Sequence, residues 1–113
     1  MKIKKLQKTI DKWIKEYGVR YFDEKTNMIL LMEETGELAR LIARKYGEQS
    51  FKIPIADDVL KERISDEISD ILFVLTCLSN QMNIDMEDAI IKNLGKKTKR
   101  DHSRHKSNKK LNK

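Results

Sequence analysis

The sequence has only one cysteine, one proline and four glycines among its 113 residues, and aromatic residues make up 6% of it. A single cysteine cannot form an intrachain disulfide, which excludes a disulfide-stabilised fold and agrees with a reducing compartment. The scarcity of proline and glycine argues against a turn-rich β fold and favours long regular elements. We therefore expect one all-α domain, with Cys77 buried in its core.

Long apolar runs are also missing. No stretch approaches the roughly 20 apolar residues that span a bilayer, and the first residues do not show the pattern of a signal peptide. These two absences predict a protein without membrane association and with a cytoplasmic location.

Acidic side chains are nearly absent from the C-terminal end. Residues 92–113 carry ten Lys or Arg side chains and one acid, Asp101, so this segment has a net charge of +9 while the rest of the chain has −3. We expect residues 1–104 to form the domain and residues 105–113 a basic, disordered tail. The basic end leaves open a second class of function, a small helical nucleic-acid-binding or adaptor protein, although no aromatic residue lies among these cations.

Apolar residues recur with a helical period in four segments. These are residues 2–18, 26–46, 59–82 and 86–100. Gly18 and Gly47 are expected to end the first two helices, Gly47 as the residue after the C-cap, while Asp57 or Asp58 caps the third and Asp85 the fourth. The third helix is the most apolar, and past residue 71 we expect it to be buried on nearly all sides. Because so short a chain buries little alone, the predicted fold is a bundle of about four helices per protomer, completed by oligomerisation.

Two pairs of carboxylates interrupt the apolar faces of the second and third helices. Glu34 and Glu37 project from the middle of a leucine stripe, and Glu67 and Asp70 repeat the same spacing beside the apolar face of the third helix. If the two helices pack antiparallel, the four carboxylates converge, and four like charges at close range need cations. Oxygen ligands of this kind suit Mg²⁺ or Mn²⁺. The alternative is neutralisation by basic side chains, for which the candidates are Lys45 and Arg63.

The acidic residues also carry a resemblance to a known family. The segments "EETGELARL" and "DEISDILFVL" resemble the EExxE and ExxD signature of the MazG-like all-α nucleotide pyrophosphohydrolases, and the likeness extends from about Tyr21 to Arg104. It is greatest to the short, single-domain bacterial members. The resemblance implies a helical protomer that pairs with another, as a homodimer or a dimer of dimers. It also implies Mg²⁺-dependent hydrolysis of a nucleoside triphosphate to the monophosphate and pyrophosphate, by attack of water on the α-phosphorus.

The resemblance further assigns roles to individual residues. The implied catalytic set is Glu33, Glu34, Glu37, Glu67 and Asp70. Four of these would be the metal ligands, namely Glu34, Glu37, Glu67 and Asp70, while Glu33 would orient the attacking water or support a ligand. The cations expected at the phosphates are Lys96, Arg100 and Arg104.

The residues that hold the base are left open by the sequence. Trp13, Tyr21 and Phe22 are candidates for stacking on it, with core packing the favoured interpretation of Trp13. A family member that has lost activity and only binds nucleotides or partners also stays open. The preference for a particular base or sugar cannot be inferred from these motifs.

Overall fold

The computed structural model describes residues 2–112 and contains helices without any strand in that range. The helices are α1 (Ile3–Trp13), a π-helical turn η1 (Ile14–Gly18) that continues it, α2 (Glu24–Tyr46), α3 (Asp57–Gln81) and α4 (Met86–Asp101). The predicted all-α class and the four helices are therefore confirmed. None of the helices in residues 2–112 is both long and apolar enough to cross a membrane.

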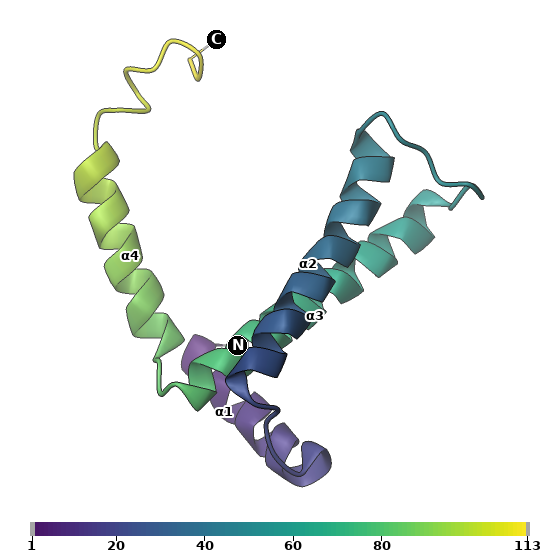
Figure 1. The fold of residues 1–113 in the computed structure, drawn as a ribbon. Helices are drawn as coiled ribbons and strands as arrows, with labels where there is room; N and C mark the ends of the chain where they lie inside the picture. Colours follow the sequence, from purple (N-terminus) through teal and green to yellow (C-terminus); the bar gives the residue numbers. More distant parts are fainter. Residues whose placement is uncertain (1, 113) are drawn as a thin grey trace.

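The two longest helices, α2 and α3, form an antiparallel hairpin (Figure 1). Asn27, near the start of α2, donates a hydrogen bond of 2.9 Å to the side chain of Gln81, the last residue of α3, which fixes the opposite directions of the two helices. The α1 helix crosses α3 near the same end of the hairpin, and α4 packs mainly against α1 before it runs away from the hairpin (Figure 1). The chain consequently has an open outline of 51 × 47 × 27 Å.

The core lies where α1 crosses α3. Ile10, Ile14 and Cys77 form its centre, and Tyr21 and Phe73 pack against them. Cys77 is buried as predicted, and this burial raises the pKa of its thiol to about 11. This cluster therefore lies at one end of the α2–α3 hairpin, while Leu41 and Leu60 are buried nearer the α2–α3 loop.

The helix ends agree only partly with the predicted caps. Asp85 caps α4 by accepting a hydrogen bond of 3.0 Å from the backbone of Asp88, as expected. The prediction that Asp57 or Asp58 caps α3 is wrong, because the N-cap is Ala56 and both aspartates lie within the first turn. Their position there still places negative charge at the positive end of the helix dipole.

Gly47 ends α2 for a different reason from the one expected. It is the C-cap itself and has a φ of −90°, so it does not use the left-handed conformation typical of the following residue. Its amide donates to the carbonyl oxygen of Ala43, and a Cβ at this position would collide with that oxygen. The glycine is therefore needed for a close backbone approach.

The α3 helix is less enclosed than predicted. Val74, Cys77 and Leu78 are buried, but Leu72 and Leu75 keep 43% and 42% of their surface exposed in the single chain. The expectation of burial on nearly all sides past residue 71 is therefore wrong for one protomer, because α1 and α2 together cover only part of the helix circumference.

Candidate metal centre

The middle of the α2–α3 hairpin brings the predicted carboxylates together. One oxygen from each of Glu34, Glu67 and Asp70 lies within 4.8 Å of the others. Glu37, one turn further along α2, lines the same interhelical groove as Glu67. The antiparallel packing assumed from the sequence is what produces this convergence, since each helix contributes an i, i+3 pair at the same level.

Two of these carboxylates hold buried oxygens that lack any hydrogen-bond partner. They are the Oε2 atoms of Glu34 and Glu67. A buried unpaired carboxylate oxygen is strongly unfavourable unless a cation or a donor compensates it. None of the ion pairs within residues 2–112 involves Glu34, Glu37, Glu67 or Asp70. Pairing with Lys45 or Arg63, the alternative considered above, is therefore absent from this part of the chain.

The electrostatics of the cluster act most clearly on Glu67. The pKa of its carboxyl group is raised to about 7, first because that group can share a proton with Glu34, next because of burial, and then through Glu37. Carboxylates so close together cannot all be ionised without a counter-charge. The donor set contains oxygen alone, which fits a hard divalent cation such as Mg²⁺ or Mn²⁺.

This raised pKa predicts how the metal-free protein responds to pH. A carboxyl group with a higher pKa in the folded chain contributes stability that is complete below about pH 4.5 and is lost as the pH rises through about 7. In the presence of a chelator, we expect the thermal-unfolding midpoint of the wild type to decrease, relative to that of the Glu67→Gln variant, as the pH is raised from about 4.5 to about 8. Mg²⁺ added at about pH 8 should raise the midpoint more in the wild type. Identical pH profiles for the two proteins would contradict the raised pKa.

The remaining predicted residues lie outside the cluster. Glu33 is exposed on α2. Lys96 and Arg100 are on α4 and Arg104 follows it, and this helix diverges from the hairpin that carries the acids (Figure 1). Arg100 and Arg104 both pair with Asp101, at 2.8 and 3.0 Å. A single chain therefore does not bring these three cations to the carboxylates.

An apolar pocket of about 310 Å³ lies on the core side of the carboxylates. Trp13, Tyr21 and Phe22, the three aromatic candidates, all line it. Trp13 meets the ring of Phe73 edge to face at 5.6 Å, but 48% of its surface stays exposed. Core packing, the favoured interpretation of Trp13, is therefore wrong. Phe73, which also lines this pocket, was not among the candidates predicted from the sequence.

Comparisons with known proteins agree with this fold and site. The MazG nucleotide pyrophosphohydrolase domain matches residues 22–105, close to the range predicted from the motifs. The protein YpjD of Bacillus subtilis (strain 168) is 37% identical over 102 residues, which cover 90% of this chain and 88% of that protein.

Two crystal structures are similar to most of this chain. The structure of YPJD from Bacillus subtilis has a TM-score of 0.73 at 35% identity and covers 85% of this chain and 94% of that one. The Bacillus-conserved MazG protein, described as a nucleotide pyrophosphohydrolase, has a TM-score of 0.69 at 34% identity and covers 85% and 88%. From the domain match over most of the chain, together with the shared fold, we conclude that this chain belongs to the MazG nucleotide pyrophosphohydrolase family.

Proposed function

We propose that the protein is a Mg²⁺-dependent nucleoside triphosphate pyrophosphohydrolase, which converts an NTP or dNTP to the nucleoside monophosphate and pyrophosphate. Such an activity would suit the removal of unwanted nucleotides from the cellular pool. The observation that carries the proposal is the meeting of Glu34, Glu67 and Asp70 within 4.8 Å, with two buried oxygens left without a partner. Both features support a cation site, and a triphosphate needs cations before it can approach carboxylates.

The four converging carboxylates would hold the metal. Glu34 and Glu67 supply the buried oxygens, while Glu37 and Asp70 are more exposed and close the site toward solvent. When bound there, Mg²⁺ supplies neutralisation of phosphate charge and increases the acidity of water. Glu33, exposed one residue before Glu34, would orient the attacking water. Water adds to the α-phosphorus, the bond from that phosphorus to the bridging oxygen breaks, and pyrophosphate leaves with that oxygen.

The base would occupy the apolar pocket on the core side of the carboxylates. Its aromatic walls offer stacking surfaces for any nucleobase, and its polar lining includes the amide of Asn27. This amide donates to the Phe22 carbonyl and to Gln81, so it holds the wall of the pocket against α3. The pocket volume of about 310 Å³ is within the usual range for small-ligand sites.

We further propose a homodimer, either alone or within a dimer of dimers. Ile68, Leu72 and Leu75 lie on one face of α3 at i, i+4 and i+7, and each is at least 42% exposed in the single chain. A second copy would cover this apolar face. It would also provide the route by which Lys96, Arg100 and Arg104 reach phosphates, since α4 diverges from the carboxylates of its own chain.

The direct test is product analysis with a panel of ordinary, deoxy and modified nucleoside triphosphates in the presence of Mg²⁺. Chromatography should resolve equal amounts of monophosphate and pyrophosphate, with no diphosphate or free phosphate as primary product. An assay without Mg²⁺ and with a chelator present should show no activity. Release of diphosphate and phosphate would contradict the proposed position of cleavage, and no turnover on any nucleotide would favour a binding role.

A further inference from the structure

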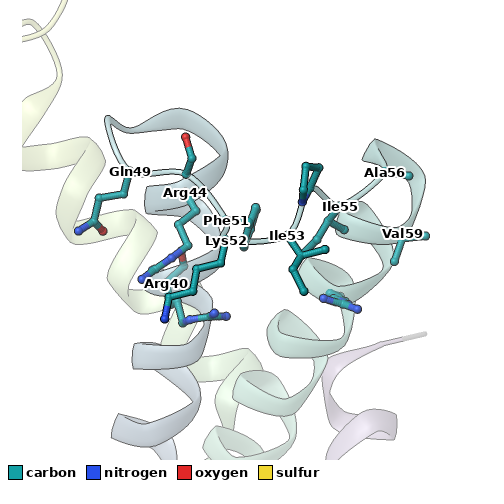
Figure 2. Close-up of a pocket in the computed structure, with 12 residues that line it drawn as sticks. Arg40, Arg44, Gln49, Phe51, Lys52, Ile53, Ile55, Ala56 and Val59 are labelled. Atoms are coloured by element: carbon teal, nitrogen blue, oxygen red, sulfur yellow. The ribbon is translucent and has the colours of Figure 1, made fainter.

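A second, larger pocket lies at the open end of the hairpin, beyond the carboxylates. It has a volume of about 830 Å³ and is enclosed by the α2–α3 loop, the end of α2 and the start of α3 (Figure 2). We call it the loop pocket. Four basic residues line it, and no Asp or Glu is among its lining residues: Arg40, Arg44, Lys52 and Arg63.

The cationic groups of the loop pocket lie near one another. The charged ends of Arg40, Arg44 and Lys52 gather on its α2 side, opposite Ile55 and Val59 (Figure 2). None of the four basic residues belongs to an ion pair within residues 2–112. Like charges held together without counter-charge create a positive potential that attracts anions. Guanidinium groups in particular match the geometry of phosphate oxygens.

The loop pocket is continuous with the carboxylate site. Arg40 and Arg63 line both the loop pocket and the narrower groove that contains Glu37 and Glu67. Arg40 is three residues after Glu37 and Arg63 four residues before Glu67. Because the helices are antiparallel, both steps lead toward the loop, by roughly 4.5–6 Å along the helix axis. The one other acid of the narrower groove, Asp66, is exposed to solvent.

The positions of the two pockets set a direction for the substrate. The apolar pocket is lined by Asn27 and Leu30, which precede the carboxylates of α2, whereas the loop pocket is lined by Arg40 and Arg44, which follow them. The carboxylates therefore lie between an apolar, aromatic end and a cationic end of the same hairpin. A nucleoside triphosphate has the same order of groups, with its base, its α-phosphorus and its terminal phosphates in sequence.

We propose that Arg40 and Arg63 bind the β- and γ-phosphates of the substrate, and that the pyrophosphate product leaves through the loop pocket past Arg44 and Lys52. This assignment rests on the proposed function. It gives each chain a phosphate subsite of its own on α2 and α3, in addition to any contribution from α4.

The test uses inorganic pyrophosphate, titrated in the presence of Mg²⁺ into the full-length protein by calorimetry. In the Arg40→Gln/Arg63→Gln variant we expect the Kd for pyrophosphate to rise about 100-fold, since each charge-assisted bond to phosphate contributes about a factor of ten or more. The matched control is Lys25→Gln/Lys61→Gln, which removes two exposed cations from the same two helices outside either pocket and should change the Kd less than about twofold.

A second measurement separates this subsite from general effects on the site. Inhibition of hydrolysis by pyrophosphate should weaken in the Arg40→Gln/Arg63→Gln variant, while inhibition by the nucleoside monophosphate stays unchanged. An unchanged Kd for pyrophosphate would overturn the assignment even if the enzyme hydrolyses triphosphates normally. If the wild type hydrolyses no triphosphate, the proposed function fails, and calorimetry with pyrophosphate still decides whether the loop pocket binds phosphates. The single variants, each expected to lose about tenfold, repeat the test if the double variant unfolds.

Discussion

Replacing Glu67 by glutamine is expected to reduce kcat/KM for nucleoside triphosphates about a thousandfold or more. Glu67 contributes one of the two buried, unpartnered oxygens of the carboxylate cluster, and one of its oxygens lies within 4.8 Å of oxygens of Glu34 and Asp70. Glutamine keeps the size of the side chain but loses the negative charge that a divalent cation requires. A thousandfold loss corresponds to about 4 kcal/mol of transition-state stabilisation, which is in the range of what a bound metal contributes.

The same substitution should leave the fold intact, and this separates a functional role from a structural one. In a chelator above about pH 7, the Glu67→Gln variant should unfold at the same temperature as the wild type or a higher one, because one of several repelling charges is removed. Glu62→Gln is the matched control, since Glu62 is exposed on the same helix and outside the groove. Full activity of the Glu67→Gln variant would contradict the assignment of the site. So would equal losses in the two variants.

Replacing Leu72 by glutamate is expected to convert the protein to a monomer of 13.3 kDa and to abolish most of its activity. Leu72 lies at the centre of the exposed apolar face of α3, between Ile68 and Leu75. A carboxylate buried in an interface between two apolar faces is strongly unfavourable. The activity should fall with the mass, because the proposed phosphate contacts of Lys96, Arg100 and Arg104 need a second chain.

Light scattering over a range of protein concentrations checks the expected change in mass, and circular dichroism checks that the helices remain. Since Leu72 is 43% exposed in the single chain, the charge can be accommodated in the monomer without loss of the helical fold. Leu72→Met, which preserves the apolar character of the face, is expected to keep the mass and the activity of the wild type. A wild-type protein that is already monomeric would contradict the dimer, and a fully active monomer of Leu72→Glu would contradict the need for a second chain.

The helices themselves were predictable because their apolar residues recur with the period of an α-helix over many turns. The observed helices α2 and α4 begin within two residues of the predicted positions. The start of α3 is likewise within two residues of the predicted position, but its N-cap was predicted wrongly, because aspartate is a preferred N-cap residue and the helix nevertheless begins directly after Ala56. The end of α2 at Gly47 depends on the close approach of this residue to the carbonyl oxygen of Ala43, which cannot be inferred from the sequence pattern.

The carboxylate cluster was largely determined by the sequence. An i, i+3 pair must project from one side of a helix, and two such pairs on apolar faces must meet if the helices pack antiparallel. The spacing also contained the signal of the proposed cationic subsite, with Arg40 one turn from Glu37 and Arg63 one turn from Glu67. That signal was missed because Arg63 was considered only as a counter-ion for the acids.

Only the tertiary structure decided which side chains are enclosed and which groups share a pocket. Trp13 has the spacing of a core residue, yet it stays half exposed. The reason is that α1 crosses α3 at one end of the hairpin, so the outer side of α1 is not covered by another helix within residues 2–112 (Figure 1). Arg40 and Lys52 reach one pocket through the course of the α2–α3 loop, which no local pattern specifies. The direction of α4 likewise follows from its packing against α1, not from its own sequence. Periodicity fixes what a helix presents on each face, whereas burial and proximity depend on where the other helices lie.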